Sequence, residues 1–284
     1  MYKSLNPGLV NIKVSGFRET LAIARKYGYG AVEYSPLALE EQGIGMSQAQ
    51  DEMGQYGVII SNFGLPVTYR TREQFNETFP KLEKTARNAR RLGISRCYTW
   101  MPSSSDEFDF AENFKRHKEM LGLCAQVLKE YDISFGVEFL GPKGAWTRGK
   151  YPFIHTLTGM LELCDAIGTG NMGLLLDAHH CHCSGISGDA FVKLIRGEKD
   201  IVVVHLNDDA KGVPPGDLPD SPRYYPGEKG GGGNDVKAFM RGLEQIGYTG
   251  PVIAEPNSAA IKAMSDNDAI AKLISESTDS VWPQ

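Results

Sequence analysis

The sequence lacks the features of several protein classes. Basic residues are not in excess, because 30 Lys and Arg stand against 35 Asp and Glu, for a net charge of -5. A chain without a basic footprint is a poor candidate for tight binding to nucleic acid. No apolar stretch approaches the roughly 18 residues of a membrane-spanning helix, and the opening MYKSLNPGLVNIKVSGF lacks the basic flank and apolar run of a signal peptide. We therefore expect neither a nucleic-acid partner nor a membrane partner.

Cysteine is also scarce. The five cysteines are odd in number and show no disulfide-framework spacing, which favours reduced thiols and a cytoplasmic location. The chain has no Gly-x-Ser-x-Gly motif of serine hydrolases. What it does have is 41% hydrophobic residues, ample material for a large core. The composition indicates a cytoplasmic globular enzyme.

Strand-like runs alternate with helix-like stretches along the whole chain. In the stretches 111–132, 155–168 and 236–247, apolar residues recur at helical spacing. The expected strands are 9–14, 31–36, 58–66, 96–102, 133–140, 172–178, 201–208 and 251–257. Nearly all-apolar strands are typical of a parallel sheet covered on both faces. Eight βα units without a long linker predict an α/β fold, a single (β/α)8 TIM barrel over residues 1–284.

Ionisable residues end four consecutive expected strands. The fifth strand ends in Glu138, the sixth in Asp177, the seventh in His205 and the eighth in Glu255. Each alone would more often cap a loop or form a salt bridge, but the carboxyl ends of barrel strands meet at one mouth. Three carboxylates and an imidazole form an oxygen-rich ligand set. They predict one divalent metal ion, Mn²⁺ foremost, with Mg²⁺, Co²⁺ or Zn²⁺ as alternatives.

A metal in such a site would polarise a carbonyl group and stabilise an enediolate. Glu138 and Glu255 could then act as an acid/base pair on opposite sides of a sugar, as an isomerisation or epimerisation requires. One alternative keeps the metal but is a lyase or dehydratase of a keto-inositol or keto-sugar. A second alternative is a barrel that binds carbohydrate without catalysis.

The stretch LLLDAHHCHCSG (174–185) is dense in potential zinc ligands. Its spacing does not match structural zinc sites, and consecutive residues of a strand point to opposite faces. We therefore interpret His179, Cys181, His182 and Cys183 as residues that pack the loop after the sixth strand. His180 lies three residues beyond Asp177 and can turn back toward a substrate.

Three aromatic residues near the expected mouth are candidate sugar contacts. Phe63 and Trp100 lie at strand ends, and Trp146 follows Glu138. Aromatic rings pack against the C–H faces of sugars, although each residue alone is as readily explained by core packing.

The strand-end motifs resemble those of the sugar isomerase/epimerase superfamily, the xylose-isomerase-like TIM barrels. The motifs that carry the resemblance are FGVEFL with Glu138, LLLDAHH with Asp177 and His180, VVVHLND with His205, RYYPGE (223–228) and VIAEP with Glu255. The resemblance implies that the four strand-end residues ligate the metal, with the two glutamates as acid/base pair. It implies substrate-oxygen contacts for His180 and Arg223 and a small-molecule carbohydrate substrate, and it is compatible with a homo-oligomer.

The chain departs from the nuclease branch of that superfamily. The nucleases resembled have a trinuclear zinc site with additional histidines, whereas the corresponding stretches here are SNFGLP, YTWMP and SPRYYPGE. None of them contains histidine, so we do not expect a nuclease.

Overall fold

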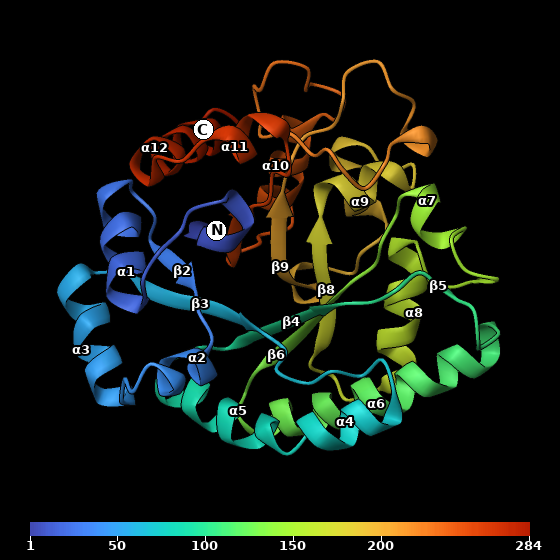
Figure 1. Cartoon of the computed structure of the whole chain (residues 1–284). Coiled ribbons are helices and arrows are strands. Elements are labelled where there is room, and N and C mark those ends of the chain that lie inside the picture. The colour runs from blue at the N-terminus through green and yellow to red at the C-terminus, as the bar shows by residue number, and fades with distance from the viewer.

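The computed structural model describes residues 1–284 and contains a closed parallel barrel (Figure 1). Neighbouring strands follow the order β1-β10-β9-β8-β6-β4-β3-β2. The barrel strands are β1 (Tyr2–Leu5), β2 (Ala31–Glu33), β3 (Ile59–Gly64), β4 (Arg96–Trp100), β6 (Ser134–Glu138), β8 (Met172–Asp177), β9 (Ile201–Leu206) and β10 (Pro251–Ala254). A separate antiparallel pair joins β5 (Ser104–Ser105) to β7 (Tyr151–Pro152). The predicted TIM barrel is confirmed.

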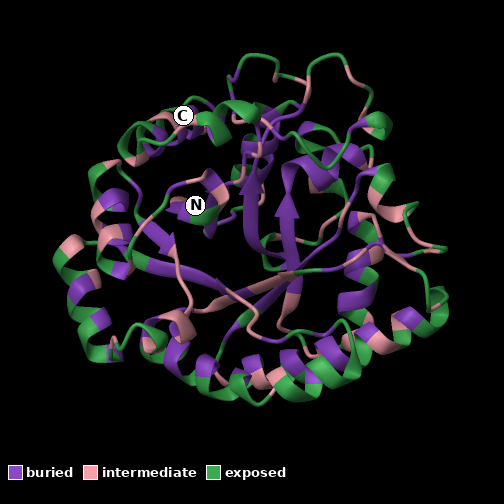
Figure 2. Ribbon diagram, viewed as in Figure 1, coloured by how far each residue is buried: buried purple, intermediate pink, exposed green.

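Helices connect the strands and cover the outside of the barrel. The α-helices are α1 (Phe17–Lys26), α2 (Pro36–Glu41), α3 (Met46–Tyr56), α4 (Arg72–Thr78), α5 (Lys81–Arg91), α6 (Phe110–Glu130), α7 (Lys143–Trp146), α8 (Leu157–Ile167), α9 (Ala178–Cys183), α10 (Val236–Gln245), α11 (Ala259–Ala263) and α12 (Asn267–Asp279). Short 3-10 helices are η1 (Pro7–Val10), η2 (Gly188–Lys193), η3 (Glu198–Asp200) and η4 (Pro215–Asp217). In Figure 2 the strands are largely buried, whereas the outer faces of the helices are exposed. None of the helices combines the length and hydropathy needed to cross a bilayer.

The expected first strand at 9–14 is wrong. The strand that closes the barrel lies earlier, at Tyr2–Leu5, where it pairs with β10 and β2. It stops because Asn6 caps η1, accepting a hydrogen bond from the Gly8 amide at 3.0 Å, and because Pro7 has no amide hydrogen to donate to a sheet. Two apolar residues of the 9–14 run are still buried, Val10 at 1% and Ile12 at 4% exposure, and Leu9 and Val14 are partly buried. Their pattern therefore indicated burial correctly and the type of element incorrectly.

A small apolar cluster forms the floor of the barrel mouth. Leu175, Val203 and Ile253 belong to it, and each lies two positions before an ionisable strand-end residue (Asp177, His205 or Glu255). Residues two positions apart on a strand face the same side. The apolar floor therefore directs these ionisable side chains into the mouth above it.

Candidate metal centre and active site

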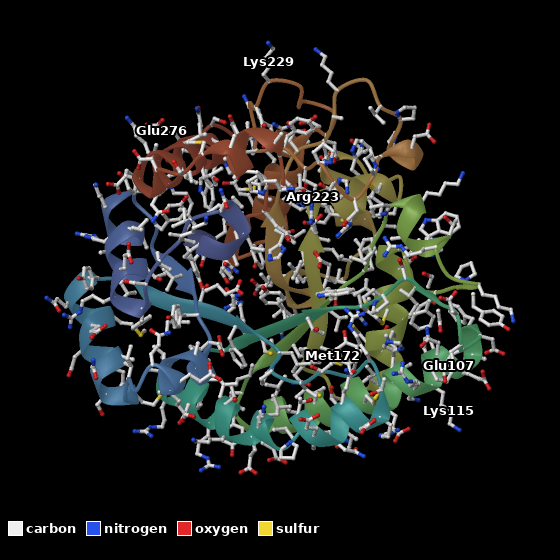
Figure 3. The ribbon with its side chains drawn as sticks, viewed as in Figure 1. Glu107, Lys115, Met172, Arg223, Lys229 and Glu276 are labelled. Atoms are coloured by element: carbon white, nitrogen blue, oxygen red, sulfur yellow. The ribbon has the colours of Figure 1, made fainter.

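Four ionisable side chains converge at the mouth. Glu138, Asp177 and His205 stand at or near the ends of β6, β8 and β9, and Glu255 follows β10. One potential ligand atom from each lies within 4.8 Å of the others. The parallel pairing of β6, β8, β9 and β10 as consecutive neighbours produces this convergence, and Asp177 and His205 are register partners on β8 and β9. In Figure 3, Arg223 lies near the upper ends of β8 and β9.

Two atoms of this group are buried without a hydrogen-bond partner. They are Oε1 of Glu138 and Nε2 of His205, whereas Nδ1 of His205 faces the group and lies 3.1 Å from Oε2 of Glu255. Oε1 of Glu138 lies 3.8 Å from Nδ1 of His205 and 3.8 Å from Nε2 of His180. Buried polar atoms are almost always paired, so atoms without partners in a converging cluster need an explanation. These residues fit a divalent cation, which accepts lone pairs from both carboxylate oxygen and imidazole nitrogen.

The electrostatics of the group also fit a cation. Burial raises the pKa of Glu138 well above its usual value, and the neighbouring Glu255 raises it further. Burial alone would lower the pKa of His205, but Glu255 and Glu138 raise it to about 9. Burial would likewise raise the pKa of Glu255, yet His205 and Arg223 lower it to about 2. Several buried carboxylates around one imidazole thus leave negative charge that a metal ion would neutralise.

Asp177 is fixed by hydrogen bonds to both carboxylate oxygens. Oδ1 accepts the amide hydrogen of His180 at 2.8 Å, which makes Asp177 the N-cap of α9. Oδ2 accepts a hydrogen from Nδ2 of Asn207 at 2.7 Å, and Oδ1 of Asn207 accepts the amide hydrogen of His179 at 2.8 Å. Because Asn207 connects β9 to α9, it orients the Asp177 carboxylate toward the other three residues. Asn207 was not among the predicted site residues.

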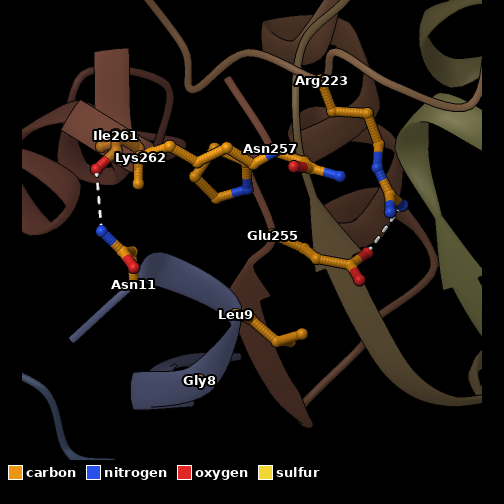
Figure 4. A pocket seen from close by; sticks show the side chains of 9 residues that line it. Gly8, Leu9, Asn11, Arg223, Glu255, Asn257, Ile261 and Lys262 are labelled. Atoms are coloured by element: carbon orange, nitrogen blue, oxygen red, sulfur yellow. Dashed lines mark hydrogen bonds and ion pairs between the residues drawn. The ribbon is translucent and has the colours of Figure 1, made fainter. Parts of the chain in front are cut away.

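Arg223 joins the site from the long loop after β9. Its Nη1 donates to Oε2 of Glu255 at 2.9 Å and lies 3.9 Å from Oδ2 of Asp177. The loop is held in place because the Arg223 carbonyl accepts the amide hydrogen of Asn257 at 2.8 Å. Arg223 and Glu255 both line a cavity of about 270 Å³ whose other walls include Leu9 and Lys262 (Figure 4). The structure therefore opens the site to a small molecule beside Glu255.

The histidines and cysteines of 179–183 are all buried on α9. The Asp209 carboxylate accepts hydrogen bonds from Nδ1 of His179 at 2.5 Å and from Nδ1 of His182 at 2.6 Å. His179 and His182 are therefore packing residues as interpreted, but the expected loop is wrong, because 178–183 form a helix that Asp177 caps. His180 instead faces the four strand-end residues, with its Nε2 3.8 Å from Oε1 of Glu138. A second set of potential ligand atoms, from His179, His180 and the exposed Asp220, also lies within 4.8 Å of one another.

The three candidate aromatic contacts occupy different positions. Trp100 pairs in register with Glu138, so both side chains stand on the same face of the sheet. Trp100 is 42% exposed, and the Arg70 guanidinium lies 4.5 Å from the centroid of the Trp100 ring. Trp146 stacks on His155 with ring centroids 4.5 Å apart. The structure does not bring Phe63 to the mouth, because its side chain is fully buried in the hydrophobic core.

The far wall of the mouth holds a carboxylate that the sequence analysis missed. Glu33, the last residue of β2, accepts a hydrogen bond from the Tyr98 hydroxyl at 2.7 Å and another from Nδ2 of Asn62 at 3.1 Å. The Tyr98 ring meets the His205 ring edge-on, with centroids 5.6 Å apart. Burial raises the pKa of Glu33. Its signal was available, because AVE at 31–33 has the same form as GVE at 136–138: a glutamate after an apolar strand.

A closed (β/α)8 barrel whose mouth gathers residues that could hold a metal ion belongs to a class of proteins whose sites lie at the carboxyl ends of the strands. Within this class, the chain belongs to the xylose isomerase-like TIM barrel family, whose model matches residues 21–276. The predicted superfamily is confirmed.

Individual relatives agree with this assignment. The chain is similar to an inosose isomerase of Bacillus velezensis, 22% identical over 247 residues that cover 85% of this chain and 83% of the relative. It also resembles the structure of a xylose isomerase domain protein from Alicyclobacillus acidocaldarius, with a TM-score of 0.86, 26% identity, and coverage of 99% of this chain and 98% of the other. A crystal structure of the IOLI protein with a binding zinc atom shares the fold with a TM-score of 0.80, 20% identity, and coverage of 99% and 98%.

Proposed function

We propose that the protein is a divalent-metal-dependent isomerase or epimerase that moves a proton next to the carbonyl group of a sugar or keto-sugar. The observation that carries the proposal is the convergence of Glu138, Asp177, His205 and Glu255 with unpartnered buried ligand atoms. The similarity to inosose isomerases and the fold shared with D-psicose 3-epimerase, at a TM-score of 0.70, 18% identity, and coverage of 99% of this chain and 98% of the other, support the same class.

The four strand-end residues would hold the metal, whose chemistry is to polarise the substrate carbonyl and so acidify the neighbouring C–H bond. Glu138 and Glu255 stand on β6 and directly after β10, with β8 and β9 between them. The two carboxylates would therefore approach a bound substrate from different sides. Their surroundings shift the pKa of Glu138 up and that of Glu255 down. Such divergence suits a pair that exchanges acid and base roles.

The remaining residues supply binding and orientation. His180 and Arg223 lie beside the metal group and can bind substrate oxygens, with Arg223 also holding Glu255 in place. We assign Trp100 and Trp146 as aromatic rings that would pack against the C–H face of the sugar. The oxygen-rich ligand set favours Mn²⁺, although a relative's structure contains zinc. The five buried, unpaired cysteines suit the reducing cytoplasm.

Proton NMR in D₂O tests the proposal. The Mn²⁺-loaded protein is incubated with an inosose, with D-psicose and with D-fructose, and each product is identified. Deuterium entering at the carbon next to the carbonyl, with the carbon skeleton and all oxygens retained, is the expected result. Loss of water from the substrate would instead identify a dehydratase. Absence of both exchange and turnover with every sugar would contradict the proposal.

A further inference from the structure

The wall formed by β2, β3 and β4 has chemistry that the metal centre does not explain. Glu33 places a carboxylate there, and its side chain is only partly exposed. Glu33 forms no ion pair within 4.0 Å, and the only charged group that lowers its pKa is the more distant His205. A buried carboxylate without a cation is costly unless hydrogen-bond donors surround it. Such a group at an enzyme's mouth is a candidate for a functional role.

Glu33 is held rigidly by a chain of hydrogen bonds that crosses four strands. The hydroxyl of Ser4 on β1 lies 2.8 Å from that of Ser61 on β3, and the Ser61 hydroxyl donates to Oδ1 of Asn62 at 2.5 Å. Nδ2 of Asn62 then donates to Oε2 of Glu33, and the Tyr98 hydroxyl donates to Oε1. Since Ser4 and Ser61 are almost fully buried, the chain fixes the position of the carboxylate before any ligand arrives.

The Glu33 carboxylate keeps unused capacity to accept hydrogen bonds. An ionised carboxylate has about four acceptor positions. The side chains of Tyr98 and Asn62 fill one on each oxygen, and the side chain of Asn6 also lowers the pKa of Glu33 by hydrogen bonding. A carboxylate held by neutral donors that keeps an acceptor position open is suited to the hydroxyl groups of a ligand, much as an acidic residue binds a ribose hydroxyl in dinucleotide-binding folds.

The position of Glu33 in the barrel relates it to the metal centre. In the closed strand order, β2 stands four strands away from β8 in either direction, so Glu33 lies across the mouth from Asp177. Tyr98 spans the space between them, because its hydroxyl reaches Glu33 while its ring contacts His205. A substrate held by the four strand-end residues and reaching past Tyr98 would meet Glu33 with the carbons that do not react.

We propose that Glu33 forms a diol-binding subsite that accepts hydrogen bonds from two neighbouring hydroxyl groups of a polyhydroxylated substrate. This rests on the proposed function and assigns its substrate class: a polyol with hydroxyls on consecutive carbons away from the carbonyl. The subsite contributes to binding and selectivity and takes no proton from carbon. Tyr98 and Asn62 are its positioning residues.

Equilibrium binding to the Mn²⁺-loaded protein tests the subsite without requiring turnover. The probes are an inosose and the analogues that each lack one ring hydroxyl, measured by calorimetry with wild type, Glu33→Gln and the control Glu52→Gln. Glu52 is a buried glutamate on α3 that pairs with Arg18 away from the mouth. We expect Glu33→Gln to weaken inosose binding by roughly ten- to a hundredfold, because hydrogen bonds to a charged group are lost. We expect Mn²⁺ affinity to remain unchanged.

The analogue series separates recognition from a structural effect. The two analogues that lack one or the other of two adjacent hydroxyls should bind wild type more weakly than inosose does. In Glu33→Gln the same two analogues should show little further loss of affinity. Unchanged inosose affinity in Glu33→Gln, equal losses for every analogue, or no binding of inosose by wild type would each overturn the subsite. Tighter binding of an aminodeoxy inositol would also overturn it, in favour of a cation site. Should Glu33→Gln fail to fold, Tyr98→Phe removes one positioning donor, and a severalfold weakening confined to the same analogues is expected.

The two proposals can fail separately. If deuterium exchange occurs and Glu33→Gln binds inosose as well as wild type does, the diol-binding subsite is refuted and the isomerase proposal stands. If inosose binding depends on Glu33 but neither exchange nor turnover occurs, the isomerase proposal is refuted and the subsite stands.

Discussion

The two halves of the barrel mouth differ in how their polar atoms are satisfied. The half formed by β6, β8, β9 and β10 concentrates three carboxylates and an imidazole, and two of its buried atoms have no partner. The half formed by β2, β3 and β4 carries amides and hydroxyls around Glu33, and both oxygens of that carboxylate are hydrogen-bonded. The first half is thus arranged for a cation, and the second for neutral hydroxyl groups.

The largest effect expected from altering the metal-binding half is on the rate of proton transfer. Glu138→Gln and Glu255→Gln would each remove a carboxylate to which we assign proton exchange with carbon, a role worth about 10²- to 10⁴-fold in rate. Deuterium exchange followed by NMR measures the loss, with circular dichroism to confirm folding. Glu33→Gln is the matched substitution in the other half and should retain far more of kcat. If all three variants lose kcat equally, the contrast between the halves is incorrect.

A pH effect on metal affinity is expected from His205 in the metal-binding half. His205 must lose its proton to ligate a metal, and in the protein stripped of metal its pKa is about 9. Metal affinity should therefore rise by about tenfold per pH unit between about 6.5 and 9. The stripped protein should behave oppositely, because a raised pKa contributes stability that is present below about 6.5 and lost as the pH rises through 9. Calorimetric titration with Mn²⁺ across this range measures the slope, and a flat profile would contradict it.

Asn207→Ala tests the support beneath the metal ligands. The substitution removes the hydrogen bond to Oδ2 of Asp177, so we expect metal affinity to fall by roughly 10- to 100-fold. Equilibrium dialysis against Mn²⁺ measures the change. Asn88→Ala is a suitable control, since Asn88 bonds Glu40 on the outer helices. Equal losses in both variants would indicate general destabilisation.

The smallest effects separate the two strand-end aromatics. Trp100→Ala should weaken sugar binding by about two- to tenfold, the usual worth of an aromatic contact, with little change in thermal stability. Phe63→Ala should instead cost about 3–5 kcal/mol of stability, because it empties a core position, and should leave sugar affinity unchanged in the folded protein. Calorimetry with an inosose and thermal denaturation measure both quantities. A loss of sugar affinity in Phe63→Ala and a loss of stability in Trp100→Ala would instead make Phe63 the sugar contact and Trp100 the core residue.

The ordering of helices and strands was largely predictable, because long apolar runs bounded by helical patterns dictate a parallel barrel. The first strand was not, since the Asn6–Pro7 cap ends β1 before the apolar run at 9–14 begins. Apolar periodicity over six residues does not separate a buried strand from a buried 3-10 helix and its turn. The Asn6–Pro7 cap determines where β1 ends.

The metal-binding half was predictable for a similar reason: an ionisable residue after an apolar strand stands out in a sequence. The other half was not, because Asn62 and Tyr98 are ordinary strand residues until their partners are known. A register shift between Val32 and Glu33 also places Glu33 opposite Asn62, and nothing in the sequence signals it. The same uncertainty in strand orientation made Phe63 resemble a mouth residue, although Asn62 is the one that bonds Glu33.

Metal analysis tests the convergence of the four strand-end residues most directly. The protein is stripped, dialysed against Mn²⁺ and assayed for bound metal by mass spectrometry, together with Asp177→Asn. We predict one tightly held divalent ion per chain in wild type, a higher unfolding temperature on loading, and loss of both in the variant. A wild-type chain that retains no ion and gains no thermal stability, or a variant that binds as well as wild type, would contradict the account.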